Sequence, residues 1–161
     1  MYSHDYTGSR YDGGVWITGT GSLNVFNNLR CIDGGAIYTD GIHDSDVEFN
    51  SFIGGEIGFS NGLAVRFGGR SNTLDGMSIH DPGFGNDPGG GADDCDGIVV
   101  HGDYHVIRNC QIYNNFREVP TQHTDAIQWW DYAGYLIIEG CVIGSTKWGG
   151  IGNYDYGHIQ I

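Results

Sequence analysis

The fold follows from the stretch DCDGIVVHGDYHVIRNCQIYNN (Asp94–Asn115), which is repeated in altered form as TDAIQWWDYAGYLIIEGCVIG (Thr124–Gly144). When the two stretches are aligned, Asp96 meets Asp125. Each copy reads as a short run of alternating apolar residues, a polar turn and a second alternating run, which is the pattern of two strands. Such a repeat predicts a solenoid whose neighbouring coils stack on one another and bury a shared core.

The repeat extends in both directions. Related segments precede it at Leu63–Asp81 and Gly35–Gly54, a looser one covers Gly14–Ile32, and a partial one runs to the end of the chain. The first strand of each coil has an inward anchor, and these anchors are expected to be Ile37, Val65, Ile98, Ile127 and Ile151. The same alignment places four residues in one slot of the second strand, namely Ser51, Met77, Cys110 and Cys141.

Composition supports an all-β chain. Gly accounts for 29 of the 161 residues and Pro for only 3, and no segment has helical periodicity. The net charge of −13 argues against nucleic acid as a partner, because phosphates are bound by Lys and Arg. No apolar run reaches the roughly 20 residues of a membrane span, and residues 1–13 lack the pattern of a signal peptide.

Strand alternation predicts which side chains face the core. Trp16 and Trp129 are expected inside. Cys110 and Cys141 are expected to face inward on adjacent coils, either as a disulfide or as a ladder of buried thiols. Two rows of the first strand are expected to face outward: Tyr38, Arg66, Val99, Gln128 and Gly152, followed by Asp40, Gly68, His101, Trp130 and Tyr154.

The long connections all follow the second strand of a coil, at residues 55–62, 81–95 and 114–124. Insertions on one edge of a solenoid form walls beside one face and often mark the binding face. The sequence therefore predicts a ligand cleft on the outward face of the first strand.

The cadence of DGI followed by Asn and alternating Ile or Cys covers nearly all of residues 14–161. It resembles right-handed parallel β-helix proteins of the pectate-lyase-like superfamily, which includes pectate lyases, polygalacturonase-like hydrolases and phage tail-spike depolymerases. The resemblance implies a β-helix domain of five to six coils at residues 14–161, with residues 1–13 as a cap or extension, and part of a longer helix. It also implies a secreted, extracellular or virion-associated protein.

Asp96 and Asp125 are the leading catalytic candidates, because stacking would bring two carboxylates together as an acid and a base. Their segments DCDGI and HTDAI resemble the polygalacturonase pattern. They depart from it at His123 and Ala126, and the family's Gly-His-Gly and Arg-x-Lys stretches are absent. His123 is a candidate proton shuttle. The alternative is that both aspartates cap backbone N–H groups at corners.

A second chemistry implied by the resemblance is lytic, with calcium neutralising an acidic sugar and a basic residue removing a proton. Arg117 is the candidate base. Asp93, Asp94 and Asp96 are candidate calcium ligands, since hard cations take oxygen ligands; the alternative is a solvated acidic loop. No other cofactor is expected.

The expected partner is a polysaccharide. Candidate substrate-binding residues share the outward face of the first strand: Gln128, Trp130, His101, Arg66 and Tyr154. An aromatic ring such as that of Trp130 can stack on a sugar, or can pack beneath a wall loop.

Two functions from different classes remain open. One is a polysaccharide-cleaving hydrolase or lyase, and the other is a non-catalytic glycan-binding or structural solenoid, such as a tail-fibre or cell-surface segment. A monomer is expected, and a trimer if the protein is of the tail-spike type.

Overall fold

The computed structural model describes residues 4–5, 14–17, 22–32, 37–39, 47–60, 62–83, 95–113, 115–117, 124–129, 134–144, 146–148, 154–155 and 159–160. All regular structure in these residues is β-strand, as expected from the composition. None of them forms a helix long and apolar enough to cross a membrane.

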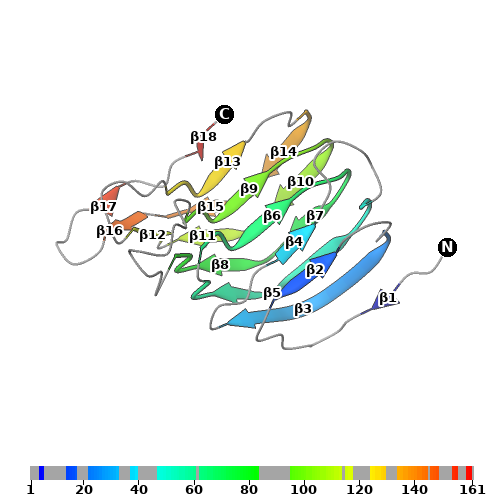
Figure 1. Cartoon of the computed structure of the whole chain (residues 1–161), viewed down its shortest axis with the longest axis horizontal. Coiled ribbons are helices and arrows are strands. Elements are labelled where there is room, and N and C mark those ends of the chain that lie inside the picture. Colours follow the sequence, from blue (N-terminus) through cyan, green and yellow to red (C-terminus); the bar gives the residue numbers. More distant parts are fainter. Residues whose placement is uncertain are drawn as a thin grey trace.

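Eighteen strands form three sheets (Figure 1). The six-stranded sheet contains, in spatial order, β18 (Ile159–Gln160), β13 (Ile127–Trp129), β9 (Ile98–Val100), β6 (Val65–Phe67), β4 (Ile37–Thr39) and β2 (Val15–Ile17). The nine-stranded sheet contains β1 (His4–Asp5), β3 (Asn24–Ile32), β5 (Ser51–Gly58), β7 (Thr73–Asp75), β8 (Ser78–His80), β10 (His105–Arg108), β11 (Gln111–Tyr113), β14 (Leu136–Glu139) and β15 (Val142–Ile143). The third sheet contains β12 (Asn115–Arg117), β16 (Thr146–Trp148) and β17 (Tyr154–Asp155).

Among the described strands, every pair is parallel except β16 with β17, which is antiparallel. In the six-stranded sheet Ile37 pairs with Val65, Val65 with Ile98, and Ile98 with Ile127, so these four anchors are confirmed. The fifth anchor is wrong, because Ile127 pairs with Ile159 and not with Ile151, which lies outside the described residues. Ile151 was the wrong choice of anchor because the connections between strands vary in length.

The slot assigned to Ser51 is also wrong. Ser51 pairs with Thr73, and Glu56 pairs with Ser78, so Gly55 is the residue beside Met77. The connection from β4 to β5 holds 11 residues, whereas the one from β6 to β7 holds five. A corner that is six residues longer shifted the alignment. The later assignments are correct, since Gln111 pairs with Ser78 on one side and with Val142 on the other.

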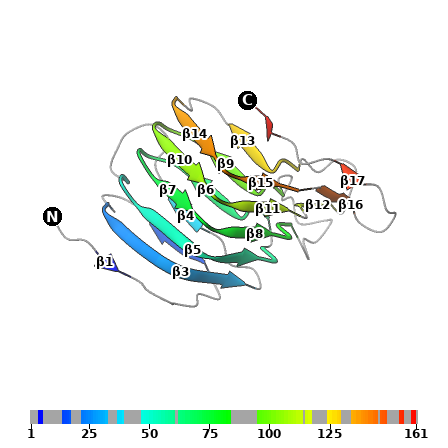
Figure 2. The ribbon, with the colours of Figure 1, turned by 180° about the vertical axis from the view of Figure 1, so that it is seen from behind.

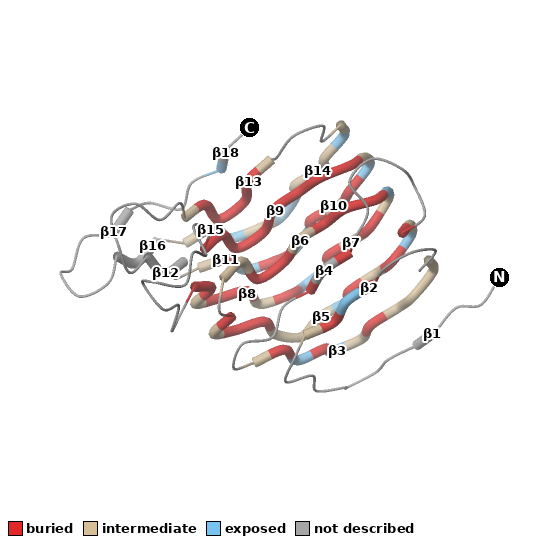
Figure 3. The backbone as a smooth tube through the Cα atoms, viewed as in Figure 1, coloured by how far each residue is buried: buried red, intermediate tan, exposed pale blue. Residues whose placement is uncertain are grey.

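The core lies between the six-stranded and nine-stranded sheets, which Figures 1 and 2 show from opposite sides. Phe26 and Phe52 stack on neighbouring strands of the larger sheet with ring centroids 4.8 Å apart, and Phe52 lies 6.2 Å from Phe67 of the smaller sheet. Buried positions alternate with less buried ones along β2, β6 and β10 (Figure 3), as expected for strands with one face on the core. Trp16 is an exception to the prediction, because its residue is 67% exposed and lies outside this core.

All four cysteines are free thiols. Cys110 is buried and Cys141 packs against the core, which agrees with the predicted ladder of thiols. Burial raises the pKa of the Cys31 and Cys110 thiols to about 11, so both remain protonated at neutral pH.

A row of left-handed residues bends the nine-stranded sheet. Register brings Asn28, Gly54, Gly76, Asn109 and Gly140 into line, and their φ angles are 52°, 63°, 69°, 54° and 62°. Glycine and asparagine tolerate this conformation better than other residues. The chain therefore turns at the same place along the sheet, between β7 and β8 and again between β10 and β11.

A ladder of buried amides closes the other corner. Asn50 Oδ1 accepts the backbone N–H of Asn24 at 3.1 Å, and Asn72 Oδ1 accepts that of Asn50 at 3.0 Å. His105 occupies the next position: its Nδ1 accepts the N–H of Asn72 at 3.2 Å, and its Nε2 donates to the carbonyl of His101 at 2.7 Å. One acceptor and one donor on the same ring define a neutral imidazole.

Replacing His105 with asparagine should make the protein less sensitive to acid. Burial lowers the pKa of His105 below the 6.5 of an ordinary histidine, although its two backbone hydrogen bonds oppose this. As pH falls below about 6.5, the unfolded chain takes up this proton before the folded chain does, so stability is lost by up to about 1.4 kcal/mol per pH unit. Urea denaturation of wild type and His105→Asn between about pH 7.5 and pH 5 measures the difference. Equal slopes in the two proteins would contradict this assignment.

Candidate functional site

Asp96 and Asp125 lie side by side at the start of β9 and β13. The backbone N–H of Gly97 donates to the carbonyl of Asp125 at 2.8 Å, and the N–H of Asp125 donates to Oδ1 of Asp96 at 2.5 Å. The two residues are 0% and 1% exposed. The structure thus brings together the two carboxylate residues that the repeat aligned, and it gives Asp96 the backbone hydrogen bond expected of a corner cap.

The outward face of the six-stranded sheet is not uniformly open. Arg66 is half-buried, whereas Val99 and Gln128 of the same row are buried, and so is His101 in the next row. The sequence predicted that these three residues lie on the outward side of the sheet, and it did not predict that they are buried. Alternation indicates correctly that they share one side of the sheet, but it does not show what covers that side. Gln128 and His101 are therefore buried polar groups on the outward side of the sheet.

Tyr154 does not extend the outward row. It lies in β17, where it pairs with Lys147 of β16 in the three-stranded sheet. The backbone of Arg117 lies in β12 of that same sheet, and its side chain lies outside the description. The remaining predicted site residues lie outside the described residues altogether: Asp93, Asp94, His123 and Trp130.

The calcium prediction stays a prediction. Within the part of the chain that the structure describes, no three His, Cys, Asp or Glu residues are grouped so that they could hold a metal ion. Asp96 is described, but its two proposed partners, Asp93 and Asp94, are not.

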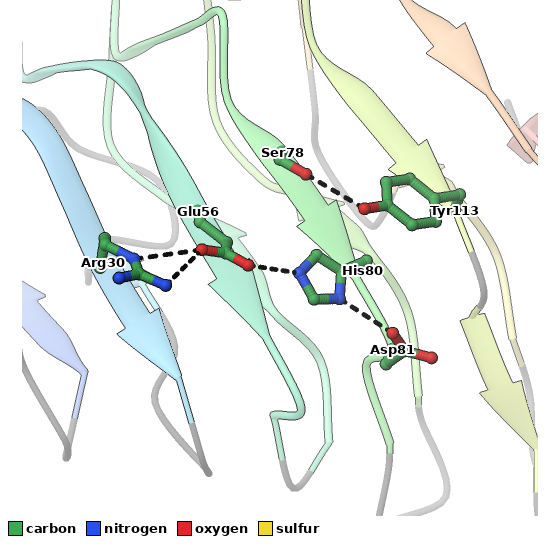
Figure 4. Close-up of polar contacts among 6 residues, drawn as sticks. All are labelled: Arg30, Glu56, Ser78, His80, Asp81 and Tyr113. Carbon is green, nitrogen blue, oxygen red and sulfur yellow. Dashed lines mark hydrogen bonds and ion pairs between the residues drawn. The ribbon is translucent and has the colours of Figure 1, made fainter.

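A second polar cluster, which the sequence did not indicate, lies on the outward face of β5 and β8 (Figure 4). His80 Nδ1 lies 2.8 Å from Oδ2 of Asp81, and its Nε2 lies 3.0 Å from Oε1 of Glu56. Arg30 of β3 binds the other oxygen of Glu56 through Nη2 at 2.8 Å and Nε at 3.1 Å. An ion-pair chain therefore crosses three parallel strands, from Arg30 through Glu56 and His80 to Asp81.

The His80 ring contacts two aromatic rings. It stacks on Tyr113 of β11 with ring centroids 5.3 Å apart, and it makes a T-shaped contact with Phe59 with ring centroids 5.5 Å apart. A Cβ at Gly58 would lie 2.5 Å from the His80 ring, so only glycine leaves room for it there. The hydrogen bond from His80 lowers the pKa of Glu56, burial opposes this, and Arg30 adds to the lowering.

Correct register was the signal that could have revealed this cluster. Arg30, Glu56 and Ser78 occupy one outward row, and Gly58, His80 and Tyr113 occupy the next. The longer connection before β5 leads to the wrong predicted partner for Ser51. The predicted register therefore also places Glu56 away from His80.

No protein-family model, curated protein or solved structure matches the chain.

Proposed function

We propose that the chain folds as a right-handed parallel β-helix and cleaves a polysaccharide beside Asp96 and Asp125. Support for the fold comes from the repeated order of pairing: β6, β7 and β8 are followed by β9, β10 and β11, and each strand pairs in parallel with its counterpart. Successive coils of one helix would produce this register.

The observation that carries the function is the residue type at the two corners of the coil. At one corner Asn50 and Asn72 accept backbone N–H groups without bringing charge into the protein. At the start of β9, Asp96 accepts the same kind of bond, yet it is a carboxylate in a buried position one strand away from Asp125. An asparagine would serve as a cap there, and burying a carboxylate is costly. We infer that the charge at this corner is retained for chemistry.

Two carboxylates on adjacent strands suit an acid and base pair, because neighbouring strands of a sheet are only about 4.8 Å apart. One protonates the oxygen of the leaving sugar, and the other either activates water or attacks the sugar carbon. Gln128 and His101 would contact sugar hydroxyls, and the acidic chain favours an uncharged or cation-bridged glycan. Such a substrate agrees with a protein that works outside the cell or on a virion.

The test is a screen of neutral and uronic polysaccharides that reads both new reducing ends and the ultraviolet absorbance of unsaturated products, which separates hydrolysis from lysis. Asp96→Asn and Asp125→Asn should each lose activity on the order of a hundredfold. Their melting temperatures should be unchanged or higher, since the amide keeps the acceptor and removes a buried charge. Asp75→Asn, which removes a carboxylate from the opposite sheet, is the matched control and should retain activity.

The second candidate is a non-catalytic glycan-binding or structural solenoid. The hydrogen bond from Asp125 N–H to Asp96 favours it, because a cap needs nothing more. In that case both asparagine variants would keep every binding property of the wild type, and no polysaccharide would be cleaved by either protein.

A further inference from the structure

We propose that the contacts of His80 depend on its protonation. As an imidazolium, His80 binds both Glu56 of β5 and Asp81 and so holds the corner after β8 against β5. As a neutral ring, it loses one of these two contacts. The inference is independent of the proposed activity. It concerns the ion-pair chain on the outward face of β3, β5 and β8 (Figure 4).

The argument starts from the two nitrogens of the ring. Both lie within hydrogen-bond distance of a carboxylate oxygen, Asp81 at 2.8 Å and Glu56 at 3.0 Å. A neutral imidazole has one N–H donor and one lone pair, whereas an imidazolium has two donors. Carboxylates accept and do not donate when ionised, so only the imidazolium satisfies both contacts at once.

The groups around the ring support this assignment. Among the described residues, the charged or titratable groups near it are Glu56 from β5, Asp81 in its own segment and Tyr113 from β11, while Arg30 of β3 lies behind Glu56. With His80 protonated, the chain alternates positive and negative charge from Arg30 to Asp81. With His80 neutral, a lone pair faces one carboxylate, and that contact must open.

The corner that the His80 contacts would hold contains two residues with left-handed backbone conformation. Asp81 has a φ of 49° and follows His80 directly, and Phe59 on the preceding coil has a φ of 55°. Two backbone bonds close this corner, from Phe59 N–H to His80 O and from Asp81 N–H to Tyr113 O, each 3.3 Å long. Release of Glu56 or Asp81 should therefore loosen these two amides first.

The experiment combines imidazole ¹⁵N shifts with amide hydrogen exchange at about pH 5.5 and about pH 8.5. We expect both His80 nitrogens to be protonated at the lower pH and one at the higher. After correction for intrinsic exchange, protection of the Phe59 and Asp81 amides should fall about threefold or more between them. The Gly76 amide, beside the Asp75–Arg108 ion pair, is the internal control and should not change.

Glu56→Gln is the matched variant, because its amide can either accept from an imidazolium or donate to a neutral ring. It should keep the corner protected at both pH values. His105 titration has the opposite sign, since it weakens the protein in acid, and so cannot imitate the effect. A His80 ring that is neutral at the lower pH with Glu56 still in contact would overturn the proposal. A pH response of equal size in Glu56→Gln would do the same.

Discussion

Gly69→Ala should destabilise the protein by more than about 4 kcal/mol, a loss seen only when a substitution breaks the packing of the native state. Gly69 has a φ of 73°, and a Cβ added there would lie 2.1 Å from the carbonyl oxygen of Val47 on the preceding coil. That oxygen already accepts the N–H of Arg70 at 3.1 Å. The new methyl group would have to push the segments of Val47 and Gly69 apart at a place where a backbone hydrogen bond joins them.

Gly76→Ala is the matched control for the effect of conformation alone. Gly76 also has a left-handed φ, 69°, but the nearest atom to its added Cβ is 3.9 Å away, so alanine fits. It should cost only about 1 to 2 kcal/mol, the penalty of a left-handed alanine. Gly76→Asn should cost less still, because Asn28 and Asn109 already occupy the same corner in other coils. Urea denaturation compares the three variants, and equal losses for Gly69→Ala and Gly76→Ala would contradict close coil contact at Gly69.

The sequence was sufficient for strand content and for the register of β4, β6, β9 and β13 in the six-stranded sheet. Ile37, Val65, Ile98 and Ile127 could be aligned because alternation and the DGI-like cadence mark the same point in each coil. No comparable pattern in the sequence marks how long the connection between two strands is. The next anchor, Ile159, lies 32 residues after Ile127, and a shorter spacing to Ile151 satisfied the same apolar pattern.

The site was predictable to the same degree. Asp96 and Asp125 share one position in a repeat, so sequence alone could place them together. Their burial, and that of Gln128, could not be predicted, because alternation assigns a side of the sheet and not its covering. His80 was missed for a different reason: Glu56 is 24 residues earlier, and only correct pairing of β5 with β8 brings the two together.

Asn72→Ala should cost about 4 kcal/mol. The Asn72 side chain is fully buried and uses all of its hydrogen-bonding groups: Oδ1 accepts from N and Nδ2 of Asn50, both at 3.0 Å, and Nδ2 donates to the carbonyls of Val47 at 3.2 Å and Gly68 at 2.8 Å. Truncation leaves two donors and two acceptors buried without this partner, at roughly 1 to 3 kcal/mol for each group that stays unsatisfied.

Two further variants separate the amide ladder from simple loss of volume. Asn72→Asp keeps the acceptor for Asn50 but turns an oxygen toward the carbonyls of Val47 and Gly68, so it should be at least as damaging as alanine although its size is unchanged. Asn24→Ala, at the half-buried end of the ladder, loses one side-chain bond to Asn50 and should cost about 1 kcal/mol. Chemical denaturation gives the three values, and hydrogen exchange of the Asn50 amide reports the ladder directly. If Asn72→Asp were as stable as wild type, a carboxylate would be as acceptable at this corner as an amide. The contrast with Asp96, which supports a chemical role for the charge at the other corner, would then lose its physical basis.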